Sequence, residues 1–343
     1  ERVSVILRGR DTMRSARLAV TATSERIHCF SILALLHPND MPNKTGILKK
    51  IRGRQLRGGG WVLVADGSSP VVVDASVANI VLHEEGGPLD PALIGTEAWA
   101  ALDEAGFVAN DGEPVRPLPG DSPSQAMRLV RVLTWISLLF FSPIILALSL
   151  RQGFPGGASL VLHERGLAVS IAYILVFAMI TASLHECGHI VLGGLSKRAS
   201  GSLKWSPRSA VATTNLSHVW AWSPIGRYSA ILAGIGVDLD VLLIVVALRQ
   251  WRPCAELDLM TSVLFLRIMW QFRLHSNCDG KYLARMILDD PLADFRITVS
   301  RRSGLKSRKS TPGESCFTAL GYLSSALIFV IWIIPLIRHF SST

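Results

Sequence analysis

The sequence predicts a membrane protein: an all-α transmembrane bundle of about five or six helices, preceded by a small N-terminal α+β domain. Three observations support this fold class. The 343-residue chain is 49% hydrophobic with a mean hydropathy of +0.37, which is too apolar for an ordinary soluble protein. From residue 129 onward it contains five apolar runs of roughly 20 residues, the length that crosses a bilayer. Before them, a hairpin pattern is followed by two helical patterns.

Residues 1–57 form an N-terminal segment of uncertain structure, with 12 Lys and Arg against 4 Asp and Glu. Val3–Leu7 is a candidate strand, whereas Ile27–Leu36 is apolar but too short to span a bilayer. The basic stretch Lys44–Arg57 is either a solvated face or a contact for anionic lipid headgroups.

Residues 58–115 are predicted to form a small folded domain. The β-branched runs Trp61–Ala65 and Val71–Val73 are joined by D-G-S-S-P, which predicts a hairpin, and helices are expected at Ser76–Glu85 and Ile94–Ala105. This order, with the phrase E-A-W-A-A-L-D-E-A-G-F-V, resembles the PqqD-like peptide-recognition domains. The resemblance implies a winged-helix-like unit that binds a leader segment at a strand edge. A small domain without a peptide role is the alternative.

Residues 109–126 are rich in Pro, Gly, Asp and Ser and are predicted to be a linker, which leads into a transmembrane domain at residues 127–343. Pro143 is acceptable in a membrane helix because neighbouring groups can satisfy the freed backbone. The five predicted spans are Leu129–Leu150, Leu167–Leu195, Tyr228–Leu248, Leu257–Leu274 and Phe317–Ile337.

The charge distribution predicts how these spans are oriented. The first 128 residues have a net charge of about −1, so the excess of +9 belongs to the membrane half and indicates orientation and not nucleic-acid binding. Successive loops carry two, five, two and eight Lys and Arg. This alternation predicts a multi-pass protein of the cell membrane with a cytoplasmic N-terminal domain. It also puts the ends of the second and fourth spans on the cytoplasmic side. The five scattered cysteines suggest no disulfide framework.

The stretch S-L-H-E-C-G-H at the end of the second span is the strongest candidate for a functional site. His185 and His189 are four residues apart, so both imidazoles lie on one helix face and can bind one Zn²⁺ ion. Glu186 lies between them and can take a proton from water at the metal. Ionisable side chains inside an apolar span are costly, so they are functional candidates by default.

Two histidines leave a hydrolytic zinc site without its third protein ligand. The predicted orientation puts the end of the fourth span at the same membrane depth as the motif. There the sequence reads H-S-N-C-D-G-K-Y-L, and Asp279 is the obvious carboxylate.

H-E-C-G-H in one span and S-N-C-D-G-K-Y-L after another resemble the site-2-protease family of intramembrane zinc metalloproteases, over most of residues 165–295. The resemblance implies that His185, His189 and Asp279 bind zinc and that Glu186 activates water. The third span, A-I-L-A-G-I-G-V-D-L-D-V-L-L, is similar to the family's glycine-containing core helix. The family's usual Pro is replaced by Ile235 and by Cys278, which suits a divergent branch. D-G-K-Y-L-A-R-M-I-L-D-D-P is similar to bacterial members found beside peptide-maturation systems.

Three further residues are weaker site candidates. Asp238 in the third span either lines the active-site cavity or has a structural role, and Asn277 occupies the family's polar position before Asp279. His218 lies in the loop before the third span, where similar proteins add a substrate strand.

Four other residues near these motifs have structural explanations. Asp240 is predicted to pair with Arg267 inside the bundle. Cys187 and Cys278 are small packing residues, because a fourth thiolate ligand would close the site. His275 is either a partner of Asp279 or an interfacial side chain.

The expected function is hydrolysis of a peptide bond in a membrane-embedded or membrane-docked peptide or protein, with Zn²⁺ as the cofactor and membrane lipid as the surroundings. The alternative is a non-catalytic zinc-binding membrane subunit of a peptide export, maturation or immunity system. Release of a membrane-tethered factor would use the same chemistry on a different substrate.

Overall fold

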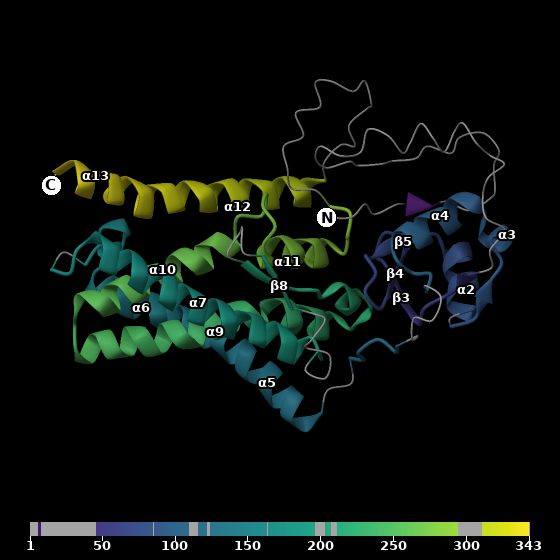
Figure 1. The fold of residues 1–343 in the computed structure, drawn as a ribbon, viewed down its shortest axis with the longest axis horizontal. Helices are drawn as coiled ribbons and strands as arrows, with labels where there is room; N and C mark the ends of the chain where they lie inside the picture. Colours follow the sequence, from purple (N-terminus) through teal and green to yellow (C-terminus); the bar gives the residue numbers. More distant parts are fainter. Residues whose placement is uncertain are drawn as a thin grey trace, which may run out of the picture. The chain divides into compact units, whose positions relative to one another are not determined.

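The computed structural model describes residues 6–7, 46–84, 86–109, 116–121, 124–162, 164–195, 203–206, 211–293 and 311–342. The chain divides into two compact units. The first contains Glu1–Pro119 with Ser217–Trp222 and Asp289–Leu292, and the second contains Gly120–Leu216, Ser223–Leu288 and Ala293–Thr343. Figure 1 shows their helices and strands. The predicted apolar run at 27–36 lies outside the described residues.

The first unit is built on a four-stranded sheet in the order β1-β5-β4-β3. The predicted hairpin is confirmed: β4 (Trp61–Ala65) pairs antiparallel with β5 (Val71–Val73). Ser68 closes its turn, because its hydroxyl donates to the carbonyl oxygen of Ala65 and accepts from the Ala65 N–H. The short strand β1 (Ile6–Leu7) runs parallel to β5.

The sheet extends beyond the expected start of the domain at residue 58. Strand β3 (Ile51–Gln55) pairs antiparallel with β4, so part of the predicted basic stretch belongs to the folded unit. The reason is alternation: Ile51 is buried and Arg52 is exposed, as the two faces of a strand require. A second short ladder joins β2 (Gly46–Ile47) to β6 (Pro88–Leu89).

Among the described residues, three helices complete the core of the first unit. They are α2 (Ala75–His83), α3 (Pro91–Ile94) and α4 (Thr96–Glu104), and α2 and α4 confirm the two predicted helices to within two residues. Asp74 caps α2 by accepting a hydrogen bond from the N–H of Val77. Apolar side chains from strands and helices, among them Leu63, Val81 and Leu102, form one buried cluster.

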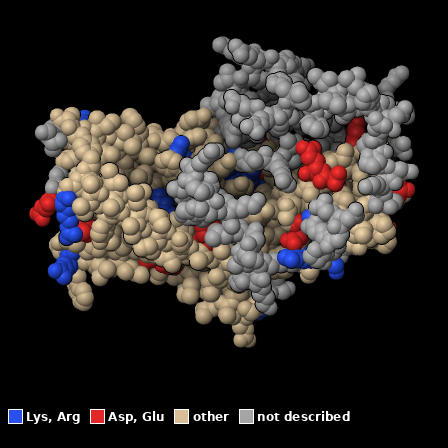
Figure 2. All heavy atoms as spheres, viewed as in Figure 1, with Lys and Arg blue, Asp and Glu red and all other residues tan. Residues whose placement is uncertain are grey.

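Where the structure describes the second unit, it contains four helices that are long and apolar enough to cross a membrane, which indicates a multi-pass membrane protein. α9 is the most enclosed of them: 56% of its most apolar window is buried, against 11% for α7. Figure 2 shows a surface over these helices that is largely free of charged side chains. The four are Gln125–Gln152 (α5, Gln125–Ile136; η1, Ser137–Phe141; α6, Ser142–Gln152), α7 (Leu167–Leu192), α9 (Pro224–Trp251) and Pro312–Ser341 (α12, Pro312–Ile328; η5, Phe329–Ile333; α13, Ile334–Ser342).

The remaining predicted span, Leu257–Leu274, is shorter than expected. Helix α10 (Ala255–Gln271) has 17 residues and is not one of the four long apolar helices in the described part of the chain. It contains Arg267, and a tight turn separates it from α11 (Asp279–Leu288). Of the five or six expected spans, four correspond to helices in the described residues that are long and apolar enough to cross a membrane.

Helix α9 packs against both α7 and α10. Glycines allow the close approach: a Cβ on Gly188 of α7 would lie 3.0 Å from the carbonyl oxygen of Ala233 on α9. A Cβ on Gly234 would overlap with the Nε2 atom of His185. Small residues at this crossing therefore let the backbone of α9 approach the imidazole of His185 directly.

Candidate metal centre

His185 and His189 lie one turn apart on α7, and both are buried. Their Nε2 atoms are 3.2 Å apart, so the two rings point toward a common place. The i, i+4 spacing produces this arrangement because such residues lie one above the other on a helix.

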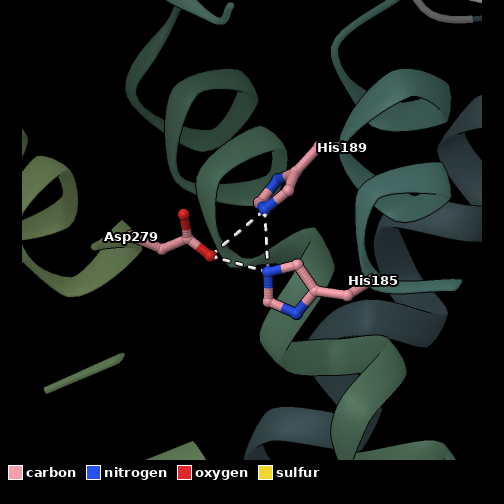
Figure 3. A group of neighbouring side chains, drawn as sticks. All are labelled: His185, His189 and Asp279. Carbon is pink, nitrogen blue, oxygen red and sulfur yellow. Dashed lines mark hydrogen bonds and ion pairs between the residues drawn. The ribbon is translucent and has the colours of Figure 1, made fainter. Parts of the chain in front are cut away.

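Asp279 joins the two histidines from another element, as the sequence predicted. It is the first residue of α11, and its Oδ2 atom lies 2.9 Å from Nε2 of His185 and 3.1 Å from Nε2 of His189. Figure 3 shows the two histidines of α7 and Asp279 of α11 converging on one place. Their ligand atoms all lie within 4.8 Å of one another, and the group could hold a metal ion.

The outward-facing ring nitrogens show why a cation fits here. Nδ1 of His185 lies 2.8 Å from Oδ2 of Asp238, and Nδ1 of His189 lies 2.9 Å from the carbonyl oxygen of Ala230. Both partners are acceptors, so each Nδ1 carries a hydrogen and a neutral ring then offers the lone pair of Nε2. Two such lone pairs and a carboxylate oxygen converge without a donor among them, and a metal ion satisfies all three.

The turn before α11 is built to place Asp279. The side-chain oxygen of Gln271 accepts a hydrogen bond of 3.2 Å from the Asp279 N–H, and the Cys278 thiol donates to the Gln271 carbonyl oxygen at 3.0 Å. A Cβ on Gly280 would overlap with that same carbonyl oxygen. Only glycine therefore allows this close approach, which explains physically why Gly280 follows Asp279.

The electrostatics of the turn keep Asp279 ionised and Cys278 neutral. Burial alone would raise the pKa of Asp279, but the two facing imidazoles, when they carry a proton, lower this pKa well below its usual range. A bound cation would act in the same direction. Burial raises the pKa of the Cys278 thiol, which disfavours the thiolate that binds metals. Cys187, the other cysteine of the motifs, is exposed. The burial of Cys278 agrees with a packing role, whereas the exposure of Cys187 does not.

Glu186 lies beside the two histidines on α7 and is half-buried. Its Oε2 atom accepts a hydrogen bond of 2.7 Å from the hydroxyl of Thr214. Thr214 ends β8 (Val211–Thr214), which forms a hairpin with β7 (Leu203–Ser206). Sequence reasoning missed this contact, because nothing in the pattern of the loop tells which residue reaches the α7 helix.

Asp238 supports a histidine, and its charged partner differs from the prediction. Its Oδ2 atom accepts from Nδ1 of His185 and also, at 3.1 Å, from Nε of Arg267. The predicted pair between Asp240 and Arg267 is therefore wrong, because Arg267 binds Asp238 instead. Asp240 accepts a hydrogen bond of 2.6 Å from Ser137.

The other candidates lie in different settings. Asn277 is exposed in the turn before Asp279. His275 stacks on Tyr322 with ring centroids 5.2 Å apart. His218 is buried in η4 (Ser217–Ala221), where its ring packs edge-on against Trp222. The structure thus brings Asp238 to the histidines, whereas His275 and His218 pack against aromatic side chains.

Comparison of the chain with protein-family models, curated proteins and solved structures finds no match.

Proposed function

We propose that this chain is an intramembrane zinc metalloprotease of site-2-protease type. One observation carries the proposal: a buried His185, His189 and Asp279 group within a set of long apolar helices, with Glu186 in the same helical turn as the two histidines. A metal site with three protein ligands leaves a position for water, and a neighbouring carboxylate is then placed to act as a base.

The donor set favours zinc over other common metals. Two imidazole nitrogens and one carboxylate oxygen are the ligand types of catalytic zinc sites, whereas Mg²⁺ and Ca²⁺ prefer oxygen ligands throughout. When bound, zinc would make water acidic enough to attack at neutral pH and would polarise the scissile carbonyl.

The chain's own residues would then handle the protons. Glu186 would accept a proton from the attacking water and return it to the nitrogen of the leaving amine. The Thr214 hydrogen bond would hold the Glu186 carboxylate in place, and Asp238 would fix the ring of His185.

The proposed substrate is a peptide or protein segment that is embedded in the membrane or docked on it. A helical segment hides its carbonyl groups in hydrogen bonds, so it must unwind locally before it can react. The loop charges favour a site near the cytoplasmic face, and the N-terminal unit is a candidate for selecting a leader segment.

Replacing Glu186 with Gln tests the catalytic part of the proposal. The variant should keep the three metal ligands and bind zinc like the wild type. Cells that express it should lack the membrane-peptide fragments that accumulate with wild-type protein, as measured by terminal-peptide mapping of membrane fractions. Identical fragments in the two strains would exclude catalysis by Glu186. If no fragment depends on the wild-type protein although zinc is bound, the alternative of a non-catalytic zinc-binding subunit is favoured.

A further inference from the structure

Helix α10 provides none of the three candidate ligands, yet two of its side chains contact residues of the centre. Arg267 binds Asp238, the partner of His185, and Gln271 binds the backbone N–H of Asp279. We infer that Arg267 and Gln271 are positioning residues of the metal centre. This inference rests on the proposed metal site and adds to it a supporting helix. Arg267 and Gln271 are four residues apart, so they lie on one face of α10.

Arg267 acts on the histidine side of the centre. Its Nε donates to Oδ2 of Asp238, the same oxygen that faces Nδ1 of His185. A second guanidinium nitrogen, Nη1, donates a hydrogen bond of 3.3 Å to the hydroxyl of Thr181 on α7. One guanidinium thus joins α10 to the helix of Asp238 and to the helix of His185.

Arg267 also explains how Asp238 can lie in the bundle. The side chain of Asp238 is 1% exposed, and a carboxylate in such a place is costly unless it is paired. With Arg267 in place, Asp238 keeps a fixed carboxylate in front of Nδ1 of His185. That contact selects the ring orientation in which Nε2 faces the centre.

Gln271 acts on the carboxylate side of the centre. Its side-chain oxygen receives the Asp279 N–H, and its backbone carbonyl receives the Cys278 thiol and lies against Gly280. Gln271, at the end of α10, therefore holds Cys278 and Asp279 by hydrogen bonds, and the close approach of Gly280 adds a third contact. Because α10 holds both sides, it sets the distance of 2.9 Å between Nε2 of His185 and Oδ2 of Asp279.

The test measures metal binding by the full chain in lipid nanodiscs. Arg267→Met removes the charge and the guanidinium but keeps an unbranched apolar stem, and Gln271→Met removes the acceptor for the Asp279 N–H. Each should weaken zinc binding about 10- to 100-fold in competition with a chelator, as is usual for partners of metal ligands. With Co²⁺ in place of zinc, both should also shift the visible absorption bands, which report ligand geometry.

Two further variants separate positioning from general packing. Arg267→Lys keeps the charge and should recover part of the zinc affinity lost in Arg267→Met. Asp240→Asn is the matched control, because Asp240 lies on the same helix as Asp238 but binds Ser137. It should keep wild-type zinc affinity and the wild-type Co²⁺ spectrum.

Wild-type affinity and spectrum in folded Arg267→Met and Gln271→Met would overturn the inference, and so would an equal loss in Asp240→Asn. If Arg267→Met fails to fold, the decision rests on Arg267→Lys and Gln271→Met in the same way. A wild-type protein that binds no metal would instead refute the proposed metal site itself, so the two failures are distinguishable.

Discussion

In each imidazole of the candidate centre, Nδ1 faces a supporting acceptor and Nε2 faces the proposed metal position. Nδ1 of His185 faces a carboxylate and Nδ1 of His189 faces a backbone carbonyl, so the two rings are fixed by different kinds of partner. The carboxylate of Asp238 strengthens the basicity of its ring more than the neutral carbonyl of Ala230 does. Glu186, the proposed base, in turn accepts a hydrogen bond from the Thr214 hydroxyl.

Thr214→Val tests that last contact. Valine keeps the shape of threonine and removes the hydroxyl that donates to Glu186, so the carboxylate loses its orientation. Loss of a hydrogen bond to a charged group costs about 1.5–3 kcal/mol, so Glu186-dependent cleavage in cells should fall roughly tenfold or more. Zinc content should not change. Thr214→Ser is the control and should retain cleavage. Wild-type cleavage in Thr214→Val would show that the hydrogen bond to Glu186 does not contribute to catalysis.

At this scale, local spacing predicted most of the candidate centre. His185, Glu186 and His189 are fixed by one helical turn, and the structure places Asp279 with the two histidines. The partner of Arg267 was wrong because Asp238 and Asp240 are two residues apart and point to nearly opposite sides of a helix. Which side of α9 faces α10 depends on how the helices pack, and the sequence of an apolar span does not show the packing. The contact of Thr214 with Glu186 was missed because it too depends on tertiary packing, here of β8 against α7.

At the scale of elements, the centre depends on the close crossing of α7 and α9. Gly188 and Gly234 bring the backbones together, and α9 supplies the partners of both histidines, Asp238 and the carbonyl of Ala230. Helix α9, which has the composition of an ordinary apolar span, therefore packs behind the candidate metal ligands and fixes their rings. Glycine has a cost in a helix, and the close approach is the physical reason for its presence here.

Gly234→Ala is predicted to disturb the candidate centre from α9, by displacing the ring of His185. The new methyl group would overlap with Nε2 of His185, and overpacking of this kind costs about 1–3 kcal/mol. Zinc affinity should fall while the helix content stays the same by circular dichroism. Gly236→Ala is the control, because its Cβ would lie 2.9 Å from a methyl group of Thr134 and not against a ligand. Equal zinc affinity in the Gly234 variant and the wild type would contradict this role.

Two elements show where sequence reasoning about boundaries fails. Strand β3 was hidden because its arginines made residues 44–57 look like a solvated segment, although they alternate with Ile51 and Gly53. Helix α10 ends at Gln271, before the predicted end of the span, because the following residues turn to bring Asp279 to the histidines. Hydropathy alone does not show where a helix gives way to such a turn.

For the whole molecule, four long apolar helices indicate a multi-pass membrane protein, and the loop charges predict its orientation. A reporter enzyme fused after Gln250 should behave as extracytoplasmic, because the loop at residues 249–256 carries only two basic residues, Arg249 and Arg252. A reporter fused within residues 296–309, where six are basic, should behave as cytoplasmic. A cytoplasmic result after Gln250 would reverse the proposed orientation and move the candidate centre to the opposite face.

The most direct test of the proposed metal centre is the zinc content of the purified full chain, measured by elemental mass spectrometry for the wild type and for Asp279→Ala. We expect close to one zinc per wild-type chain and also per Glu186→Gln chain, since Glu186 is not one of the three proposed ligands. Asp279→Ala should lose most of its zinc, because two histidines alone leave the site incomplete. Near-stoichiometric zinc in Asp279→Ala, or none in the wild type, would contradict the proposed metal centre.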